Sequence, residues 1–230
     1  MPDISIVIPV LDEAREIAAC LQPLQTWRAA GHEVIVVDGG SSDATVALAA
    51  PLADRVVVSA PGRAVQMNYG ASQSQGRLLV FLHADTSLPA AALGVLEQIA
   101  LIEAGGWGRF DVTLSGSHWG LWIIAAAMNF RSRMTGIATG DQGIFITRRM
   151  FDSVGGYRDL ALMEDIDLCT RLRTLAHPQC LFLSVTTSSR RWERGGIFTT
   201  VLRMWWLRLQ FFCGVDSRQL ADCYRAVRER

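Results

Sequence analysis

The stretch ISIVIPV, residues 4–10, is a short apolar run rich in β-branched side chains, and EVIVV, residues 33–37, repeats this character before Asp38. Both runs are typical of strands that are buried on both faces of a parallel sheet. Two more such runs, 55–59 and 78–82, follow, with helical or turn-forming segments between them. Strands that alternate with helices predict an α/β fold, a mostly parallel sheet with helices on both faces. Such sheets bind ligands beyond the carboxyl ends of their strands, where we expect the site.

The expected helices follow from apolar spacing and capping residues. Asp12 can cap the first helix and Gly31 can end it, with an apolar face formed by Ile17, Leu21, Leu24 and Trp27. Thr86 or Ser87 is expected to cap a later helix over 92–102. The second half is less regular. It predicts strands over 107–113, 143–146 and 181–186, a helical stretch over 162–175 that begins at Glu164-Asp165, and an aromatic-rich helical tail over 197–212.

The composition excludes several classes of protein. Half of the 230 residues are hydrophobic, and acidic and basic residues balance at 22 each. A net charge of zero gives no electrostatic reason to expect nucleic acid as a partner. All 22 basic residues are arginine. The chain therefore lacks both the amine of a Schiff-base enzyme and the lysine of a Walker-type phosphate loop.

The cysteines and the apolar segments bear on location. The five cysteines are spaced neither as metal-binding pairs nor as a disulfide framework. Unpaired thiols are typical of a reducing compartment, and no leader-like segment is visible, so we expect a cytoplasmic protein. Two apolar segments, 112–130 and 197–215, are interrupted by polar residues or arginine, so neither predicts a transmembrane helix.

Six motifs stand in order along the chain: SIVIPVLDE (5–13), EVIVVDGGSSDAT (33–45), GRAVQMNYGA (62–71), FLHAD (81–85), VGGY (154–157) and EDIDLCTRL (164–172). In order and spacing they resemble the family 2 glycosyltransferases, and GDQG, RRWE and the tail resemble its small bacterial members. The resemblance implies a single GT-A domain over 1–230. Residues 1–105 would bind the nucleotide, 106–190 would hold the acceptor and the catalytic residues, and 191–230 would form a helical tail.

The resemblance implies a nucleotide-sugar donor, bound by Pro9, Val10, Glu13, Asp38, Gly39, Arg63, Ala84 and Asp85. Asp85 matches the last carboxylate of the family's DxD motif and would bind a divalent metal, Mg²⁺ or Mn²⁺, beside the leaving diphosphate. His83 replaces the first aspartate of that motif. It can bind the metal, support Asp85 or make only local bonds. Gly39 replaces a second aspartate that reads the base in some relatives, which leaves the base open.

On the acceptor side, Glu164-Asp165 matches the family's ED pair. Asp165 would take the proton of the acceptor hydroxyl in a single displacement with inversion, and Glu164 would orient it or touch the acceptor. Gln142, Arg191 and Trp192 are expected to contact sugar or acceptor. The last two resemble the family's QxxRW element, although its glutamine is missing and no membrane spans follow, so processive polymerisation is not inferred.

Each of these residues also has a structural explanation that the sequence leaves open. Turn formation alone would explain Asp38 and Gln142. Helix capping would explain Asp85, and a favourable interaction with the helix dipole would explain Glu164 and Asp165. Arg63 would then be an exposed loop residue.

The tail raises the question of partners. It brings Trp205, Trp206, Phe211 and Phe212 beside Arg203 and Arg208. Aromatic residues with arginine suit peripheral contact with the inner face of a membrane and a lipid-linked acceptor. Packing on the core or in a homodimer explains them as well, and the acceptor itself stays unidentified.

The sequence also bears on two other functions, that of a nucleotidyltransferase and that of an inactive scaffold. A nucleotidyltransferase is disfavoured, because the end of the first strand has no glycine-rich, basic signature for a triphosphate. A catalytically inactive GT-A-like scaffold that docks through its tail stays open, because the HAD and DG motifs are altered.

Overall fold

The computed structural model describes residues 3–102 and 106–228, apart from the side chains of residues 191, 194, 197, 198 and 225–228. Within these residues one sheet has the strand order β3-β2-β1-β4-β7-β6-β8-β5. The strands are β1 (Ile4–Val10), β2 (Glu33–Asp38), β3 (Arg55–Val58), β4 (Leu78–Phe81), β5 (Thr86–Ser87), β6 (Trp107–Leu114), β7 (Ile144–Thr147) and β8 (Gln179–Thr187). The first four pair in parallel, as predicted. β7 runs antiparallel to β4 and β6, so the second half of the sheet is mixed.

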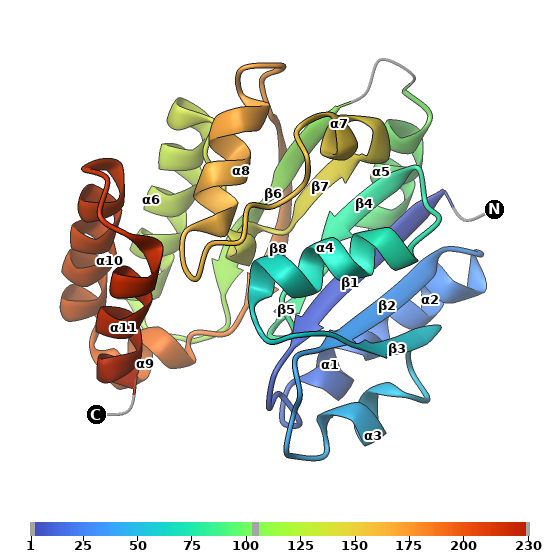
Figure 1. Ribbon diagram of the computed structural model, residues 1–230, viewed down its shortest axis with the longest axis horizontal. Helices are drawn as coiled ribbons and strands as arrows, with labels where there is room; N and C mark the ends of the chain where they lie inside the picture. The colour runs from blue at the N-terminus through green and yellow to red at the C-terminus, as the bar shows by residue number, and fades with distance from the viewer. Residues whose placement is uncertain (1–2, 103–105, 229–230) are drawn as a thin grey trace.

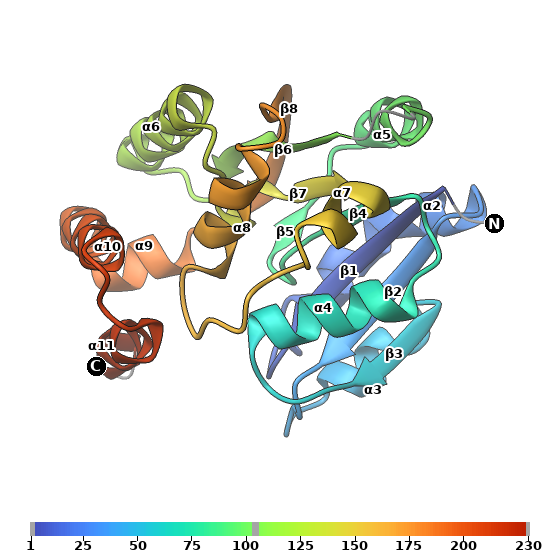
Figure 2. The same cartoon turned by 45° about the horizontal axis from the view of Figure 1, so that its top comes forward.

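Helices cover both faces of this sheet (Figures 1 and 2). One face carries α1 (Ile17–Leu21), the 3-10 turn η1 (Gln22–Leu24), α2 (Gln25–Ala29), α3 (Thr45–Ala49) and α5 (Ala92–Ala100). The other carries α4 (Arg63–Gln73), α7 (Arg148–Ser153) and α8 (Glu164–Leu172). The remaining helical elements are α6 (Trp119–Thr135), η2 (Gly140–Gln142), α9 (Arg190–Gly195), α10 (Ile197–Phe212) and α11 (Ser217–Arg228).

The central strand β1 is buried along its whole length. Its alternate side chains Ile4, Ile6 and Ile8 enter the core on one face, whereas Val7 enters the core on the other. Each such side chain contributes about 1.5–3 kcal/mol through removal from water. Gly70 allows α4 to approach closely, because a Cβ built there would lie 2.4 Å from Cγ1 of Val7. The burial of both faces explains why the run carries no polar alternation.

Two capping predictions are wrong. Asp12 does not cap a helix: it has a positive φ of 53°, and its carboxylate accepts from the backbone N–H of Ser42 at 2.8 Å. The expected long helix is instead divided into α1, η1 and α2, because Pro23 cannot donate the hydrogen bond that a continuous helix needs. Thr86 and Ser87 form β5 against β8, and α5 begins after Ala91.

The helix α6 was not predicted from the sequence; its first part overlaps the apolar segment 112–130, which is too polar for a transmembrane helix. Asn129 fixes this helix to the sheet, because its side-chain amide bonds to both the N–H (2.9 Å) and the C=O (3.1 Å) of Val112 in β6. No helix in the described part of the chain is both long and apolar enough to cross a membrane. All five cysteines are free thiols.

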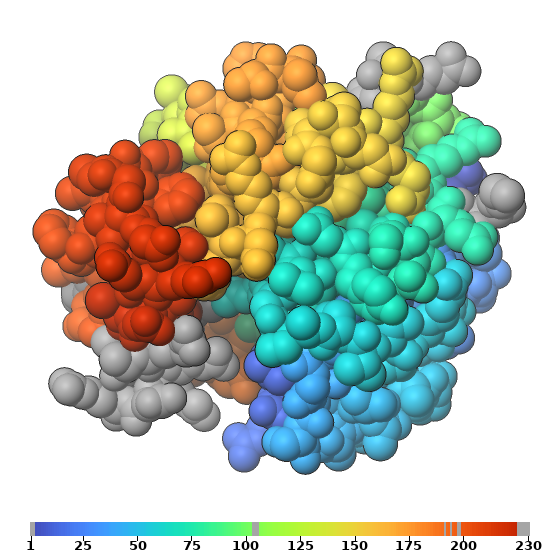
Figure 3. All heavy atoms as spheres, viewed as in Figure 1, coloured from blue at the N-terminus to red at the C-terminus, as the bar shows by residue number. Residues whose placement is uncertain are grey.

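The tail helix matches its predicted bounds, 197–212. In the space-filling view the C-terminal helices form a lobe against the segment near residue 160 (Figure 3), where the backbone N–H of Ala161 donates to Oγ of Ser217 at 3.4 Å. Leu207 and Leu220 are buried in the core. The outer face of α10 stays exposed, with Leu202, Trp205, Trp206, Leu209 and Phe212 on it. Core packing therefore accounts for one side of α10 only.

Candidate active site

The carboxyl ends of β1 and β2 are joined by the side chain of Gln66, which the sequence analysis did not single out. From α4, its Nε2 donates to the carbonyl oxygens of Val10 and Val37, both at 2.8 Å. A Cβ built at Gly39 would lie 3.2 Å from Gln66, so a larger residue at position 39 would crowd this amide. The available signal was a polar residue on the buried face of an apolar helix.

Asp38 ends β2 and organises the turn that follows. Its carboxylate accepts from the backbone N–H groups of Gly40 and Ser41, both at 3.0 Å, and from Oγ of Ser41 at 2.5 Å. Asp38 therefore does stabilise the turn after β2, as the structural explanation for this residue predicts. Pro9 pairs with Val37 across the two strands, and the backbone N–H of Gly39 donates to the carbonyl oxygen of Val10. These residues, which were predicted to bind the nucleotide sugar, therefore lie together at one edge of the sheet.

Asp85 and His83 lie in the loop between β4 and β5, where the side chains of both are partly buried. Asp85 accepts one long hydrogen bond from Oγ1 of Thr86, at 3.4 Å, and it caps no helix. Nδ1 of His83 lies 3.3 Å from Oδ1 of Asp141. Its ring also covers Gly140, where a Cβ would lie 2.2 Å from Nε2. His83 therefore faces the GDQG segment, and Ala84 between the two is buried.

A cavity of about 740 Å³ lies between α6, α8 and the C-terminal helices. Of the predicted site residues, Arg63, His83, Glu164, Asp165 and Trp192 line it. Most of the remaining wall is apolar and comes from α6 and α10. The fold thus brings together side chains that are far apart in the sequence, and it adds two arginines that the analysis did not assign to a site, Arg131 and Arg208.

Asp165 is held at this cavity by two backbone donors. Its Oδ2 accepts from the N–H of Gly140 at 2.8 Å, and its Oδ1 accepts from the N–H of Ile166 at 2.7 Å. Met163, just before α8, has a positive φ of 69°, a strained conformation for a residue other than glycine. The two hydrogen bonds from Gly140 and Ile166 fix the direction of the Asp165 carboxylate. A general base needs such a fixed direction.

Glu164 is buried beside Asp165 and faces Arg63, with 3.6 Å between Oε1 and Nη1. Burial raises the pKa of Glu164 above its ordinary value of 4.5, the charge of Arg63 opposes the rise, and the charge of Asp165 adds to it. Burial disfavours the charged carboxylate, so desolvation outweighs the ion pair here. Arg63 is not the fully exposed loop residue of the structural alternative, since it begins α4 and lines the cavity.

Of the three residues expected at the sugar, the structure describes the side chains of Gln142 and Trp192, which lie in different surroundings. Gln142 is fully buried and closes a capping box with Thr139, so its neighbour Asp141 meets the cavity instead. Trp192 lines the cavity and packs on Leu121 and Ile124 of α6. The side chain of Arg191 lies outside the described part of the structure.

Glu13, the last of the residues predicted to bind the nucleotide sugar, lies at the start of the segment after β1. Its backbone N–H donates to Oγ1 of Thr45 at 2.8 Å. Its Oε2 lies 3.7 Å from Nη2 of Arg190, which also contacts Glu16 at 3.1 Å through Nη1. These ion pairs connect the N-terminal half with α9.

The side chains can accommodate a divalent metal only with help from a ligand. Within the described residues, no group of three or more His, Cys, Asp or Glu side chains is arranged to hold an ion. Mg²⁺ and Mn²⁺ are commonly held by one or two carboxylates, with substrate phosphates as further ligands. Asp85, partly buried and with a single weak hydrogen bond to its carboxylate, fits that arrangement.

The family model described as glycosyl transferase family 2 matches residues 5–152. The chain therefore belongs to glycosyl transferase family 2. A PGL/p-HBAD biosynthesis glycosyltransferase of Mycobacterium bovis is 28% identical over 219 residues, covering 87% of this chain and 81% of the relative. The beta-monoglucosyldiacylglycerol synthase of Synechocystis is 24% identical over 85% of this chain and 48% of that protein.

Solved structures confirm the fold. The mannosyltransferase PcManGT of Pyrobaculum calidifontis, in complex with GDP-Man and Mn²⁺, has a TM-score of 0.60 at 17% identity, covering 80% of this chain and 56% of its own. Glucosyl-3-phosphoglycerate synthase of Mycobacterium tuberculosis, with Mn²⁺ and UDP, has a TM-score of 0.55 at 20% identity, covering 80% of this chain and 70% of its own. The chain is a glycosyltransferase with an α/β GT-A fold, as the sequence predicts.

Proposed function

We propose that this chain transfers one sugar from a nucleotide-diphosphate sugar to an acceptor hydroxyl with inversion at the anomeric carbon. The bond between that carbon and the diphosphate oxygen breaks, and the nucleoside diphosphate leaves with the electron pair. A bond from the acceptor oxygen to the anomeric carbon forms, and the acceptor proton passes to Asp165. The observation that carries the proposal is the Asp165 carboxylate, held by two backbone N–H groups at a 740 Å³ cavity.

The donor would bind at the carboxyl ends of β1, β2 and β4. Asp38 would meet the nucleoside through the turn that it organises, while Pro9, Val10, Glu13, Gly39 and Ala84 would shape the surface around it. Arg63 would contact the diphosphate from the cavity side, because its guanidinium has five donors and its side chain is 40% exposed beside Glu164. Asp85 would hold a divalent metal together with the diphosphate. When bound, this metal neutralises charge on the leaving group.

The acceptor would occupy the cavity, with its hydroxyl at Asp165. Glu164 would hold Arg63 in place, and Trp192 would contact the acceptor or the sugar. His83 and Asp141 would support the loop from which Gly140 donates to Asp165. Gln142, whose side chain is buried, would contact the sugar through its backbone, and Arg191 would contact the sugar or the acceptor.

The outer faces of α6 and α10 would rest on a membrane that carries the acceptor. They expose large apolar side chains, among them Trp119, Trp122, Phe130, Trp205 and Trp206. Tryptophan at this density suits the boundary between lipid and water. A relative named as a glucosyldiacylglycerol synthase supports a lipid-borne acceptor. Sedimentation with anionic vesicles tests this contact, and a stable dimer without vesicle binding would show that a second copy covers the face.

The test of the reaction is release of nucleoside diphosphate from a panel of UDP- and GDP-sugars with Mn²⁺. Asp165→Asn is expected to lower the rate by about 10²- to 10⁴-fold, the usual share of a general base. Asp159→Asn is the matched control, because Asp159 is an exposed aspartate shortly before α8. Binding of UDP should be equal in the three proteins. Full activity of Asp165→Asn would refute the assignment, and no nucleotide binding by the folded wild type would favour the inactive scaffold.

A further inference from the structure

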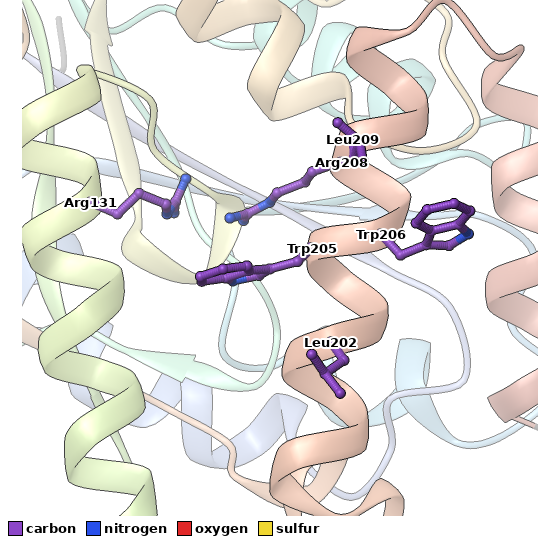
Figure 4. A pocket seen from close by; sticks show the side chains of 6 residues that line it. All are labelled: Arg131, Leu202, Trp205, Trp206, Arg208 and Leu209. Atoms are coloured by element: carbon purple, nitrogen blue, oxygen red, sulfur yellow. The ribbon is translucent and has the colours of Figure 1, made fainter.

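Two arginines face each other across the outer end of the cavity. Arg131 comes from α6 and Arg208 from α10, and their guanidinium groups point toward one another above Trp205, whereas Trp206 points away (Figure 4). The two arginines and Trp205 line the 740 Å³ cavity and also an adjoining outer hollow of about 500 Å³. They therefore stand where the cavity that contains Asp165 opens toward the surface.

The pair lacks the partners that buried arginines usually have. Nη2 of Arg131 and Nε of Arg208 are buried without a hydrogen-bond partner among the described residues. Burial and then the charge of Arg208 lower the pKa of Arg131 to about 10, and burial lowers the pKa of Arg208 although Asp165 and Asp141 oppose this. An unpaired buried donor destabilises the folded protein, and it does so more strongly when the group is charged. Asp141 and Asp165 line the same cavity, yet these two nitrogens have no partner among the described residues, so an acceptor oxygen of a ligand can still bond to them.

Arg148 shows what a structural arginine looks like in the same molecule. Its guanidinium donates to the carbonyl oxygens of Gly76, Ala71 and Ser74, each at 3.0 Å, and to Oγ of Ser74 at 2.6 Å. Such an arginine joins α4 to α7 and needs no ligand. Arg131 and Arg208 have no comparable set of bonds, so stability alone does not explain their burial.

The surroundings of the pair indicate what the ligand would be. Leu202, Trp205, Trp206 and Leu209 line the outer hollow, which is almost entirely apolar apart from the two arginines. Two guanidinium groups present several N–H donors that match the oxygens of a phosphate. A ligand that satisfies both features has a phosphate group at the arginines and an apolar chain in the hollow.

We propose that Arg131 and Arg208 form a phosphate-binding subsite for an amphiphilic acceptor, whose apolar chain leaves through the hollow between α6 and α10. This inference rests on the proposed transfer reaction, which it refines by giving the chemical class of the acceptor. We assign the phosphate to the acceptor because the pair also lines the outer hollow, which is lined neither by Arg63 nor by Asp38 or Asp85. The chemistry that this subsite would recognise is a phosphate ester on an apolar chain, as a lipid carries it.

The experiment compares binding of decyl phosphate, decyl maltoside and inorganic phosphate, each below micelle formation, by tryptophan fluorescence and calorimetry. The proteins are wild type, Arg131→Gln, Arg208→Gln, the double variant and Arg203→Gln. Arg203 is the matched control, because it is an arginine on α10 that lines neither hollow. It lies five residues before Arg208, so the two side chains leave the helix in directions about 140° apart. UDP with Mn²⁺ is titrated into every protein as an independent measure of the donor site.

We expect each single substitution to weaken decyl phosphate binding by about tenfold, and the double variant by more. Arg203→Gln should change it less than about twofold, and decyl maltoside binding should hold in all proteins. The melting temperature should stay equal or rise, since an unpaired buried charge is removed. Equal binding of decyl phosphate by wild type and the double variant would overturn the subsite.

The other outcomes are separable. Loss of UDP binding in the arginine variants would assign the pair to the donor and overturn the acceptor assignment. Inorganic phosphate that binds as tightly as decyl phosphate, with the same dependence on both arginines, would overturn the apolar chain and indicate a soluble phosphate ester. Arginine-dependent decyl phosphate binding in a wild type that binds no UDP would refute the proposed transfer reaction while supporting the subsite.

Discussion

The two sides of the proposed active site, for donor and acceptor, are built in opposite ways. On the donor side, the polar groups at the ends of β1 and β2 are bonded to one another: Gln66 joins the strand ends, and Asp38 accepts from its own turn. On the acceptor side, α6 and α10 leave arginine nitrogens unpaired and large apolar side chains exposed. The unpaired donors on the proposed acceptor side need a ligand to complete their hydrogen bonds, whereas the groups at the strand ends are already satisfied within the chain.

The largest expected effect tests the donor side through Asp85. Replacing Asp85 with alanine should lower the affinity for UDP with Mn²⁺ by about 100-fold or more, because the substitution removes the carboxylate that would hold the metal. Titration calorimetry measures this, and UDP without metal should bind both proteins equally. If the affinity of the variant for UDP depends on Mn²⁺ as that of the wild type does, then other residues hold the metal and Asp85 has a structural role only.

The next effect tests whether the donor side is as rigid as its packing indicates. Gly70→Ala should destabilise the protein by about 1–3 kcal/mol, since the new Cβ would lie 2.4 Å from Cγ1 of Val7 and 2.8 Å from Cγ2 of Val37. Gly94→Ala is a matched helical control with no atom within 4 Å of its Cβ. It should stabilise by about 0.5–1 kcal/mol. Urea unfolding measures both, and equal effects would show that α4 can move away from β1.

The smallest effect concerns Glu164, which lies where the two sides meet. Its pKa in the folded protein is raised, so the stability associated with its protonated form is present below the unfolded value near 4.5 and is lost as the pH rises through the folded pKa. Glu164→Gln keeps the neutral shape at every pH. The melting temperature of this variant relative to wild type should therefore increase from pH 4.5 to pH 7.5, and a pH-independent difference would contradict the raised pKa.

The outcome of the sequence analysis differs between the two sides for a physical reason. β1 and β2 and the helix from Glu164 were predicted near their observed bounds, because continuous apolar runs and acidic helix starts are local signals. α6 was missed, because its exposed apolar face gives no clean amphipathic pattern. The capping predictions at Asp12 and Thr86 failed because partners distant in sequence, Ser42 and Thr187, bind these residues.

The sequence by itself determined the family, the order of the first strands and the residues that end them, because motifs and apolar periodicity are written along the chain. Only the tertiary structure decided which side chains meet. It turned His83 toward Asp141, buried Gln142, gave Asp165 the N–H of Gly140, and set Arg131 against Arg208. Each of these contacts joins residues from different elements, so it depends on how helices pack on the sheet.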